Sequence, residues 1–120
     1  IGNLINVQFL YLYSNHINGT IPTSIGDLSS IKYLYIYNSL LSGSIPSNMD
    51  TLANMNVLLL YGNNLNGTIP MELPPNLGSM NVAFNELTGY IPSSLSSISN
   101  LHYFNISHSL IGKVLYICII

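Results

Sequence analysis

Few side chains in this sequence could carry out acid–base or metal chemistry. The four carboxylates are spread along the chain: Asp27, Asp50, Glu72 and Glu86. His102 and His108 stand six residues apart, roughly 20 Å in an extended strand, so they cannot share a metal ion. Catalysis needs groups that converge, and the sequence has neither a Gly-x-Ser-x-Gly elbow nor a phosphate-binding glycine loop. We therefore expect no enzymatic activity, no metal site and no cofactor.

Aromatic side chains, in contrast, recur with a spacing that suits recognition. Tyrosines stand at every second residue in Tyr11–Tyr13 and Tyr33–Tyr37, and Tyr61 lies one repeat beyond Tyr37. Rigid rings with a polar tip bury a large area at small entropic cost, so they make good binding residues. The candidate ligand-binding residues are Phe9, Tyr11, Tyr13, Tyr33, Tyr35, Tyr37, Tyr61 and Tyr103. Cross-strand packing that merely stabilises an exposed sheet is an equally weighted interpretation.

The elements that must position these rings come from a repeat. The phrase Asn-x-Ile/Leu-x-Gly-x-Ile-Pro recurs, with Ser for Asn in the second copy, at residues 15–22, 39–46, 63–70 and 85–92. A period of about two dozen residues indicates a stack of equal rungs, one repeat each. We expect a single domain over residues 1–120 with rungs at approximately 1–24, 25–48, 49–72, 73–94 and 95–120. The glycine of the phrase marks each rung in turn, at Gly19, Gly43, Gly67, Gly89 and Gly112.

Two spacings alternate within a rung. Leu10 and Leu12 stand two residues apart, which puts both side chains on one face of a short strand. Ile25, Leu28 and Ile31 are three apart, which predicts a tight 3₁₀-like turn in the return to the next strand. No rung can bury its apolar edge alone, so neighbouring rungs must stack and their strands must form a parallel ladder.

A column of asparagines follows the predicted strands. Asn15, Asn63 and Asn85 occupy the same point of their rungs, and serine replaces asparagine in rungs two and five. An inward-pointing amide is costly unless it bonds to backbone groups. We therefore predict an asparagine ladder that joins neighbouring rungs and is weaker at the serines. The alternative is that asparagine here only favours turns.

These residues resemble the plant-type leucine-rich repeat, LxxLxxLxLxxNxLxGxIPxxLGxL, over essentially the whole chain. The resemblance implies a leucine-rich-repeat solenoid, mainly β with 3₁₀ or irregular returns, of about four and a half to five rungs. It implies a right-handed curved superhelix with a concave parallel sheet and a second short sheet beside Gly-x-Ile-Pro. It also implies kinship with ectodomains of receptor-like kinases and receptor-like proteins and with polygalacturonase inhibitors. Rung four departs by losing two residues around Leu73–Asn76, which should alter the local curvature.

Three sequons predict N-glycosylation at Asn18, Asn66 and Asn105. The first two lie at the same point of rungs one and three, away from the expected concave face. Asn105 would project a glycan from that face, so we expect it to be unmodified or that end of the sheet to be unused. Turn-forming Asn-Gly pairs that match a sequon by chance are the alternative for the first two.

The composition of the chain excludes some classes of binding partner. Only 5% of the residues are charged, the formal net charge is −2, and two basic residues cannot neutralise a run of phosphates. We therefore expect no nucleic acid partner. Cys118 has no second cysteine with which to form an internal disulfide. The apolar run Val114–Ile120 is far shorter than the ~20 residues that span a bilayer. It is a further strand, an end cap or the start of a span, and membrane attachment would need parts absent from this chain.

Three functions remain open at this stage. The first is extracellular recognition of a protein, peptide or glycan by a receptor-like or secreted leucine-rich-repeat protein. The second is a structural, adhesive or ice-binding array, in which uncapped rungs associate end to end. The third is a secreted inhibitor of a cell-wall hydrolase, for which the single Lys32 offers little basic surface.

Overall fold

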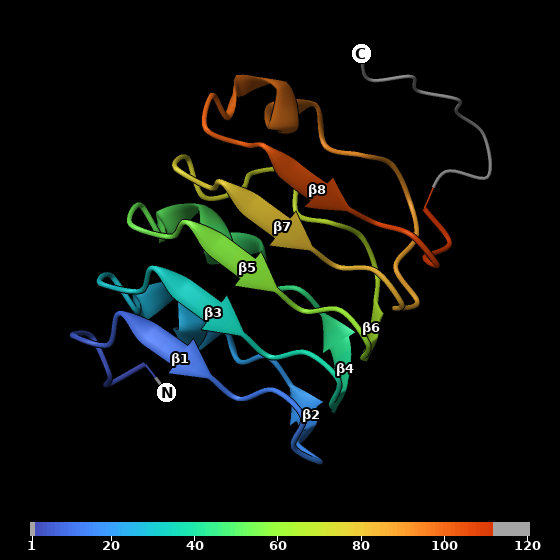
Figure 1. Ribbon diagram of the computed structural model, residues 1–120, viewed down its shortest axis with the longest axis horizontal. Helices are drawn as coiled ribbons and strands as arrows, with labels where there is room; N and C mark the ends of the chain where they lie inside the picture. Colours follow the sequence, from blue (N-terminus) through green and yellow to red (C-terminus); the bar gives the residue numbers. More distant parts are fainter. Residues whose placement is uncertain (1, 112–120) are drawn as a thin grey trace.

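The computed structural model describes residues 2–111 as one stack of short parallel strands (Figure 1). The strands are β1 (Phe9–Tyr11), β2 (Asn18–Thr20), β3 (Tyr33–Tyr35), β4 (Leu40–Ser44), β5 (Val57–Leu59), β6 (Asn64–Asn66), β7 (Ser79–Asn81) and β8 (Tyr103–Asn105). The 3₁₀ helices are η1 (Thr23–Asp27), η2 (Ser47–Thr51) and η3 (Ser93–Ser97). The predicted leucine-rich-repeat solenoid is confirmed. The segments beyond residue 111, including Gly112, Cys118 and Val114–Ile120, lie outside the described residues.

The larger sheet contains one strand from each rung, in the order β1-β3-β5-β7-β8. Its strands pair in line, so that equivalent residues such as Leu34, Leu58 and Met80 face each other. These central residues are fully buried, whereas their neighbours on either side are partly exposed. Side chains alternate across a strand, so each strand gives one apolar residue to the core and two to the solvent face of this sheet.

The smaller sheet has the order β2-β4-β6 and lies along one side of the larger one (Figure 1). Its register is staggered, because Gly19 pairs with Leu41 and Gly43 pairs with Leu65. Repeat-equivalent glycines are therefore offset by two residues, whereas equivalent residues of the larger sheet stand side by side. The repeat predicts which segments pair here, but not how they are aligned.

The returns carry the rest of the core. Ile25 in η1 and Met49 in η2 are fully buried, and Leu28 and Leu52 follow them at the helix ends. Rung four differs, because its shortened return has bends but no 3₁₀ helix between Pro70 and Leu77. Leu73 and Pro74 fill the interior there instead. The loss of two residues thus removes a helical turn from this rung.

Within residues 2–111, none of the helices has the length and apolar character needed to cross a bilayer.

Candidate functional site

The aromatic residues of the first three rungs form three stacked columns on the solvent face of the larger sheet. Backbone bonds such as Asn38 N–H to the Tyr61 carbonyl (3.0 Å) extend the in-line pairing past the strand ends. Equivalent rings are therefore held about one strand spacing apart, as ring stacking requires. We call these sets the tyrosine columns: Phe9/Tyr33, Tyr11/Tyr35 and Tyr13/Tyr37/Tyr61.

Stacking within the columns is close and nearly parallel. The ring centroids of Tyr13 and Tyr37 are 4.7 Å apart with an interplanar angle of 1°, and those of Tyr37 and Tyr61 are 4.5 Å apart at 10°. Phe9 and Tyr11 begin their columns and are 54% and 50% exposed. Only Tyr37 is stacked on both faces, and each of the other rings is stacked within its column on one face. The ring edges and hydroxyl groups remain available to a partner.

Two phenols within the columns hold their protons more firmly than a free tyrosine. Burial raises the pKa of Tyr35, and the neighbouring phenols of Tyr11, Tyr33 and Tyr37 raise it further. Burial also raises the pKa of Tyr61, again with a contribution from Tyr37. At neutral pH both side chains are therefore neutral and keep O–H groups that can donate hydrogen bonds.

Two columns end after rung two, because Val57 and Leu59 follow Tyr33 and Tyr35 in the sheet. The column Tyr13/Tyr37/Tyr61 ends at rung four, where Ala83 takes the equivalent position.

Tyr103 is exposed on β8, two rungs beyond Tyr61, and its hydroxyl accepts a hydrogen bond from Asn105 Nδ2 (3.3 Å). Seven of the eight predicted binding residues thus stack in the columns. Tyr103 joins no stack, but its phenol is near enough to contribute, after burial and Tyr37, to the raised pKa of Tyr61.

A further aromatic pair stands at the turns that follow β7 and β8. Phe84 and His108 stack with ring centroids 4.2 Å apart, and both residues have a left-handed backbone, with φ of 53° and 54°. Ser14, Asn38 and Gly62 have the same left-handed backbone at the equivalent position of the other rungs, so this conformation belongs to the repeat. The two residues stand one repeat apart in the sequence, and this spacing could have predicted that they are neighbours. The pair was not among the predicted binding residues.

Inside the stack, Asn63 joins rung three to rung two. Its Nδ2 donates to the Ile36 carbonyl of the preceding rung (2.7 Å) and to the Leu60 carbonyl of its own rung (2.9 Å). Its Oδ1 accepts a bond from the Leu41 N–H (3.1 Å). The side chain is 7% exposed, so these bonds satisfy an amide that would otherwise be costly to bury.

Asn85 repeats the arrangement one rung later. Its Nδ2 donates to the carbonyls of Leu60 (3.0 Å) and Val82 (3.1 Å), and its Oδ1 accepts from the Leu65 N–H (2.9 Å). Asn15 is exposed, and among the described residues its side chain donates only to the Tyr13 carbonyl two residues back (3.1 Å). The predicted ladder is thus formed by Asn63 and Asn85.

Serine at this position makes weaker contacts. Ser39 is buried, and its hydroxyl reaches only the Tyr37 carbonyl, at 3.5 Å. The buried hydroxyl oxygen of Ser109 has no hydrogen-bond partner among the described residues. A shorter side chain cannot bridge two rungs, which is the physical reason for the difference.

The three sequons lie in different surroundings. Asn18 on β2 and Asn66 on β6 are exposed in the smaller sheet. Asn105 is half-buried on β8, and its Oδ1 accepts the N–H of Ser107 (2.9 Å) while its Nδ2 bonds to Tyr103. An attached glycan would have to break this arrangement at Asn105 but not at the other two positions.

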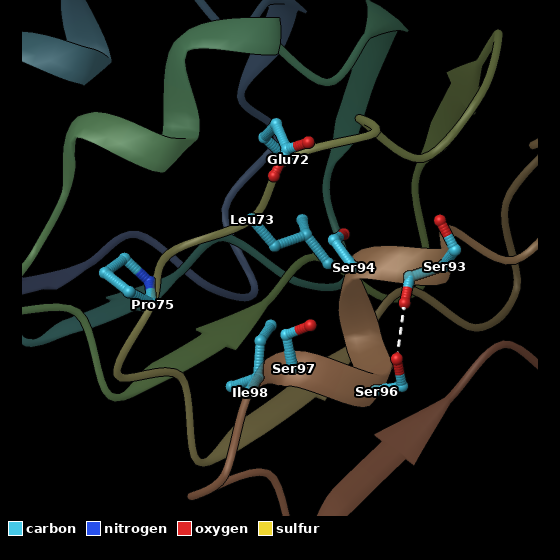
Figure 2. A pocket seen from close by; sticks show the side chains of 8 residues that line it. All are labelled: Glu72, Leu73, Pro75, Ser93, Ser94, Ser96, Ser97 and Ile98. Carbon is cyan, nitrogen blue, oxygen red and sulfur yellow. Dashed lines mark hydrogen bonds between the residues drawn. The ribbon is translucent and has the colours of Figure 1, made fainter.

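A hollow of about 520 Å³ opens in the returns of rungs four and five (Figure 2). Figure 2 shows Leu73 directed toward Ser94 on η3, whose hydroxyl donates to the Met71 carbonyl. The hollow exists because rung four has no 3₁₀ helix to pack against η3. Its polar lining consists of serine hydroxyls and the Glu72 carboxylate, with neither a histidine base nor a cation.

The charged groups of residues 2–111 are separated by face. Asp27 and Asp50 lie in η1 and η2, and Glu72 lies in the return of rung four. Glu86 lies on the side of the smaller sheet, where its N–H donates to the Leu65 carbonyl. Lys32 is exposed directly before β3. Across the described residues, no three His, Cys, Asp or Glu side chains gather where they could hold a metal ion.

Comparison with known proteins supports one family. The sequence model described as Leucine Rich Repeat matches residues 6–28. No curated protein matches the sequence significantly.

Solved structures match almost the whole chain. The structure of a TDR receptor is 34% identical over 92% of this chain and 19% of that one, with a TM-score of 0.88. The ectodomain of the receptor kinase SOBIR1 from Arabidopsis thaliana is 29% identical over 90% of this chain and 59% of that one, with a TM-score of 0.84. The Arabidopsis receptor kinase HAESA, solved with the peptide hormone IDA and the co-receptor SERK1, is 27% identical over 92% and 19%, with a TM-score of 0.82. The chain thus spans less than two thirds of each of these proteins.

Proposed function

This chain is a leucine-rich-repeat solenoid similar to plant receptor-kinase ectodomains, and we propose that it is a ligand-recognition module of an extracellular, receptor-like protein. The solvent face of the larger sheet binds the ligand, and the tyrosine columns are its centre. The observation that carries the proposal is that seven aromatic side chains form one continuous surface across three rungs.

Chemistry supports binding rather than catalysis. Tyrosine is enriched where binding energy is concentrated, because it buries much area while it freezes few torsions. The hollow beside η3 offers serine hydroxyls and one carboxylate, and no histidine, lysine or cysteine stands among its lining residues. We propose that the module has no enzymatic activity and that any signal is transmitted by parts outside this chain.

The solved relatives support a protein or peptide as the ligand. HAESA was solved with a peptide hormone and a co-receptor protein. This chain spans about a fifth of that receptor, so the nature of its own ligand is a proposal that must be tested directly.

The test is a selection of short random peptides on the immobilised chain. We expect binding of the recovered peptides to be lost in the double variant Tyr35→Ser/Tyr37→Ser, with the fold verified by circular dichroism. The matched control is Tyr90→Ser, because Tyr90 is 78% exposed outside the columns and its replacement should leave binding unchanged.

Two results would contradict the proposal. One is that no recovered peptide depends on the columns. The other is that sedimentation shows the chain forming filaments through its end rungs, as the structural alternative predicts.

A further inference from the structure

The stacking within the columns determines what kind of group the surface can bind. Sugars and cations bind aromatic residues through the ring face, which carries partial negative charge. Here the faces of Tyr37 are covered on both sides, by Tyr13 at 4.7 Å and by Tyr61 at 4.5 Å. The ring edges carry partial positive charge, and the phenol groups donate hydrogen bonds. The exposed edge and hydroxyl group of Tyr37 therefore favour hydrogen-bond acceptors over cations.

The distribution of charged side chains also favours an acidic ligand on this face. Lys32 is exposed at the entrance to β3, next to the Phe9/Tyr33 column. Its backbone lies between that of Gln8 and Asn56, so its neighbours in the adjoining strands are uncharged. The carboxylates of residues 2–111 lie on the returns and on the smaller-sheet side. Lys32, at the edge of the larger sheet where β3 begins, is thus the one lysine of residues 2–111, and none of the carboxylates of these residues lies on the strands of the larger sheet.

Neighbouring columns are spaced like the acceptors of an extended peptide. The ring centroids of Tyr33 and Tyr35 are 6.3 Å apart, and so are those of Tyr35 and Tyr37. Carbonyl groups on one edge of an extended chain recur at every second residue, roughly 6.6 Å. A peptide that runs along β3 would therefore present one carbonyl to each column in turn.

We propose that the ligand is an extended acidic peptide segment that runs along β3, with a carboxylate beside Lys32 and its backbone carbonyls over the tyrosine columns. This inference rests on the proposed function and states the chemistry of the ligand at the same site. The phenol groups donate to the carbonyls, and the ammonium group of Lys32 donates to the carboxylate in a charge-assisted bond. A cation or a sugar ring cannot stack on the covered faces of Tyr37.

The experiment determines the composition of peptides recovered from the random library at low salt. We expect the recovered pool to carry net negative charge relative to the starting library. Lys32→Ala should weaken the binding of individual peptides about tenfold or more, because a hydrogen bond to a charged group is lost. Lys32→Glu should reverse the charge of the recovered pool. The control is Glu86→Gln, which changes the net charge on a different side of the molecule and should have no such effect.

A second set of variants tests the hydroxyl groups without disturbing the stack. Tyr35→Phe, Tyr37→Phe and Tyr61→Phe preserve the rings and remove the donors. We expect the triple variant to weaken peptide binding about tenfold while it unfolds at nearly the same urea concentration.

The outcomes separate this inference from the proposed function. If Tyr35→Ser/Tyr37→Ser abolishes binding but the recovered peptides are neutral or basic, recognition stands and the acidic ligand is wrong. Unchanged binding in Lys32→Ala would also overturn it, as would an oligosaccharide that binds the columns in place of peptides. If no recovered peptide depends on the columns, the proposed function fails and this inference fails with it.

Discussion

Two sets of side chains recur at fixed points of the rungs, the asparagines inside and the tyrosines outside, and they differ in how fully their bonding capacity is used. Asn63 and Asn85 are 7% exposed and each bonds to backbone groups of two rungs. The tyrosines contact one another, but their edges remain accessible. Residues that recur with the same repeat period therefore occupy equivalent positions, but the period does not indicate whether their role is structural or functional. Burial and satisfied hydrogen bonds indicate a structural residue, and unused donors indicate a binding residue.

The largest expected effect is the loss of Asn63. Asn63→Ala leaves the Leu41 N–H and the Ile36 carbonyl without their side-chain partner inside the stack. An unsatisfied buried group costs about 1–3 kcal/mol, so we expect the free energy of unfolding to fall by about 3 kcal/mol or more in urea titrations. The matched control Asn64→Ala changes an exposed neighbour and should cost less than about 0.5 kcal/mol. Similar costs for the two variants would contradict a structural asparagine ladder.

The tyrosine columns should contribute less to stability than Asn63. Tyr35→Ser/Tyr37→Ser removes stacking on Tyr11, Tyr13 and Tyr61, and each aromatic pair is worth about 0.5–1.5 kcal/mol. Because these rings are partly exposed, we expect the three pairs to lie in the lower part of that range and the total loss to be about 1.5–3 kcal/mol in the same titration, whereas Tyr35→Phe/Tyr37→Phe should be nearly neutral. A loss larger than that of Asn63→Ala would mean that the columns are primarily structural.

The serine of rung two gives a prediction of the opposite sign. Ser39→Asn places an amide where Asn63 stands one rung later, within reach of the Leu12 carbonyl and the Ile17 N–H. Cross-rung bonds to these groups should raise the free energy of unfolding by about 1 kcal/mol, measured as a higher Tm. A lower Tm would show that the smaller cavity at Ser39 cannot accept the larger side chain.

Glycosylation extends the comparison to a third set of asparagines. Expressed in a secretory eukaryotic cell, the chain should carry glycans at Asn18 and Asn66, which are exposed, and none at Asn105, whose amide is engaged. Intact mass before and after glycosidase treatment gives the number of glycans, and Asn18→Gln and Asn66→Gln should each remove one. A glycan that persists in the double variant would place it at Asn105 and would contradict this assignment.

The smallest expected effect is alkaline destabilisation. The pKa of Tyr35 is raised from its ordinary value of 10.0 in the folded chain, so folding favours the protonated phenol. This contribution to stability is complete below pH about 10 and is lost as the pH rises through the raised pKa. We expect Tm to fall above pH about 10, and to fall less steeply in Tyr35→Phe/Tyr61→Phe. Identical alkaline profiles would show that burial in the columns does not affect these phenols.

Much of this arrangement could be predicted from spacing alone. The repeat period located the strands, the buried leucines and the ring columns, because equivalent residues of an in-line parallel sheet must stand side by side. The absence of a ring stack at Tyr103 depends on the residues of the neighbouring rungs, so no single repeat could reveal it. Phe84 and His108 were not among the predicted binding residues, because their stacking is a contact between rungs four and five that neither repeat shows by itself.

The sequence by itself determined the rung, because a period of apolar side chains can be buried only by stacking copies of the same turn. The tertiary structure alone decided the two-residue stagger of the smaller sheet, the hollow left by the shortened return, and the covering of the ring faces. Those features depend on the distance and angle between rungs, and a list of residues contains neither quantity.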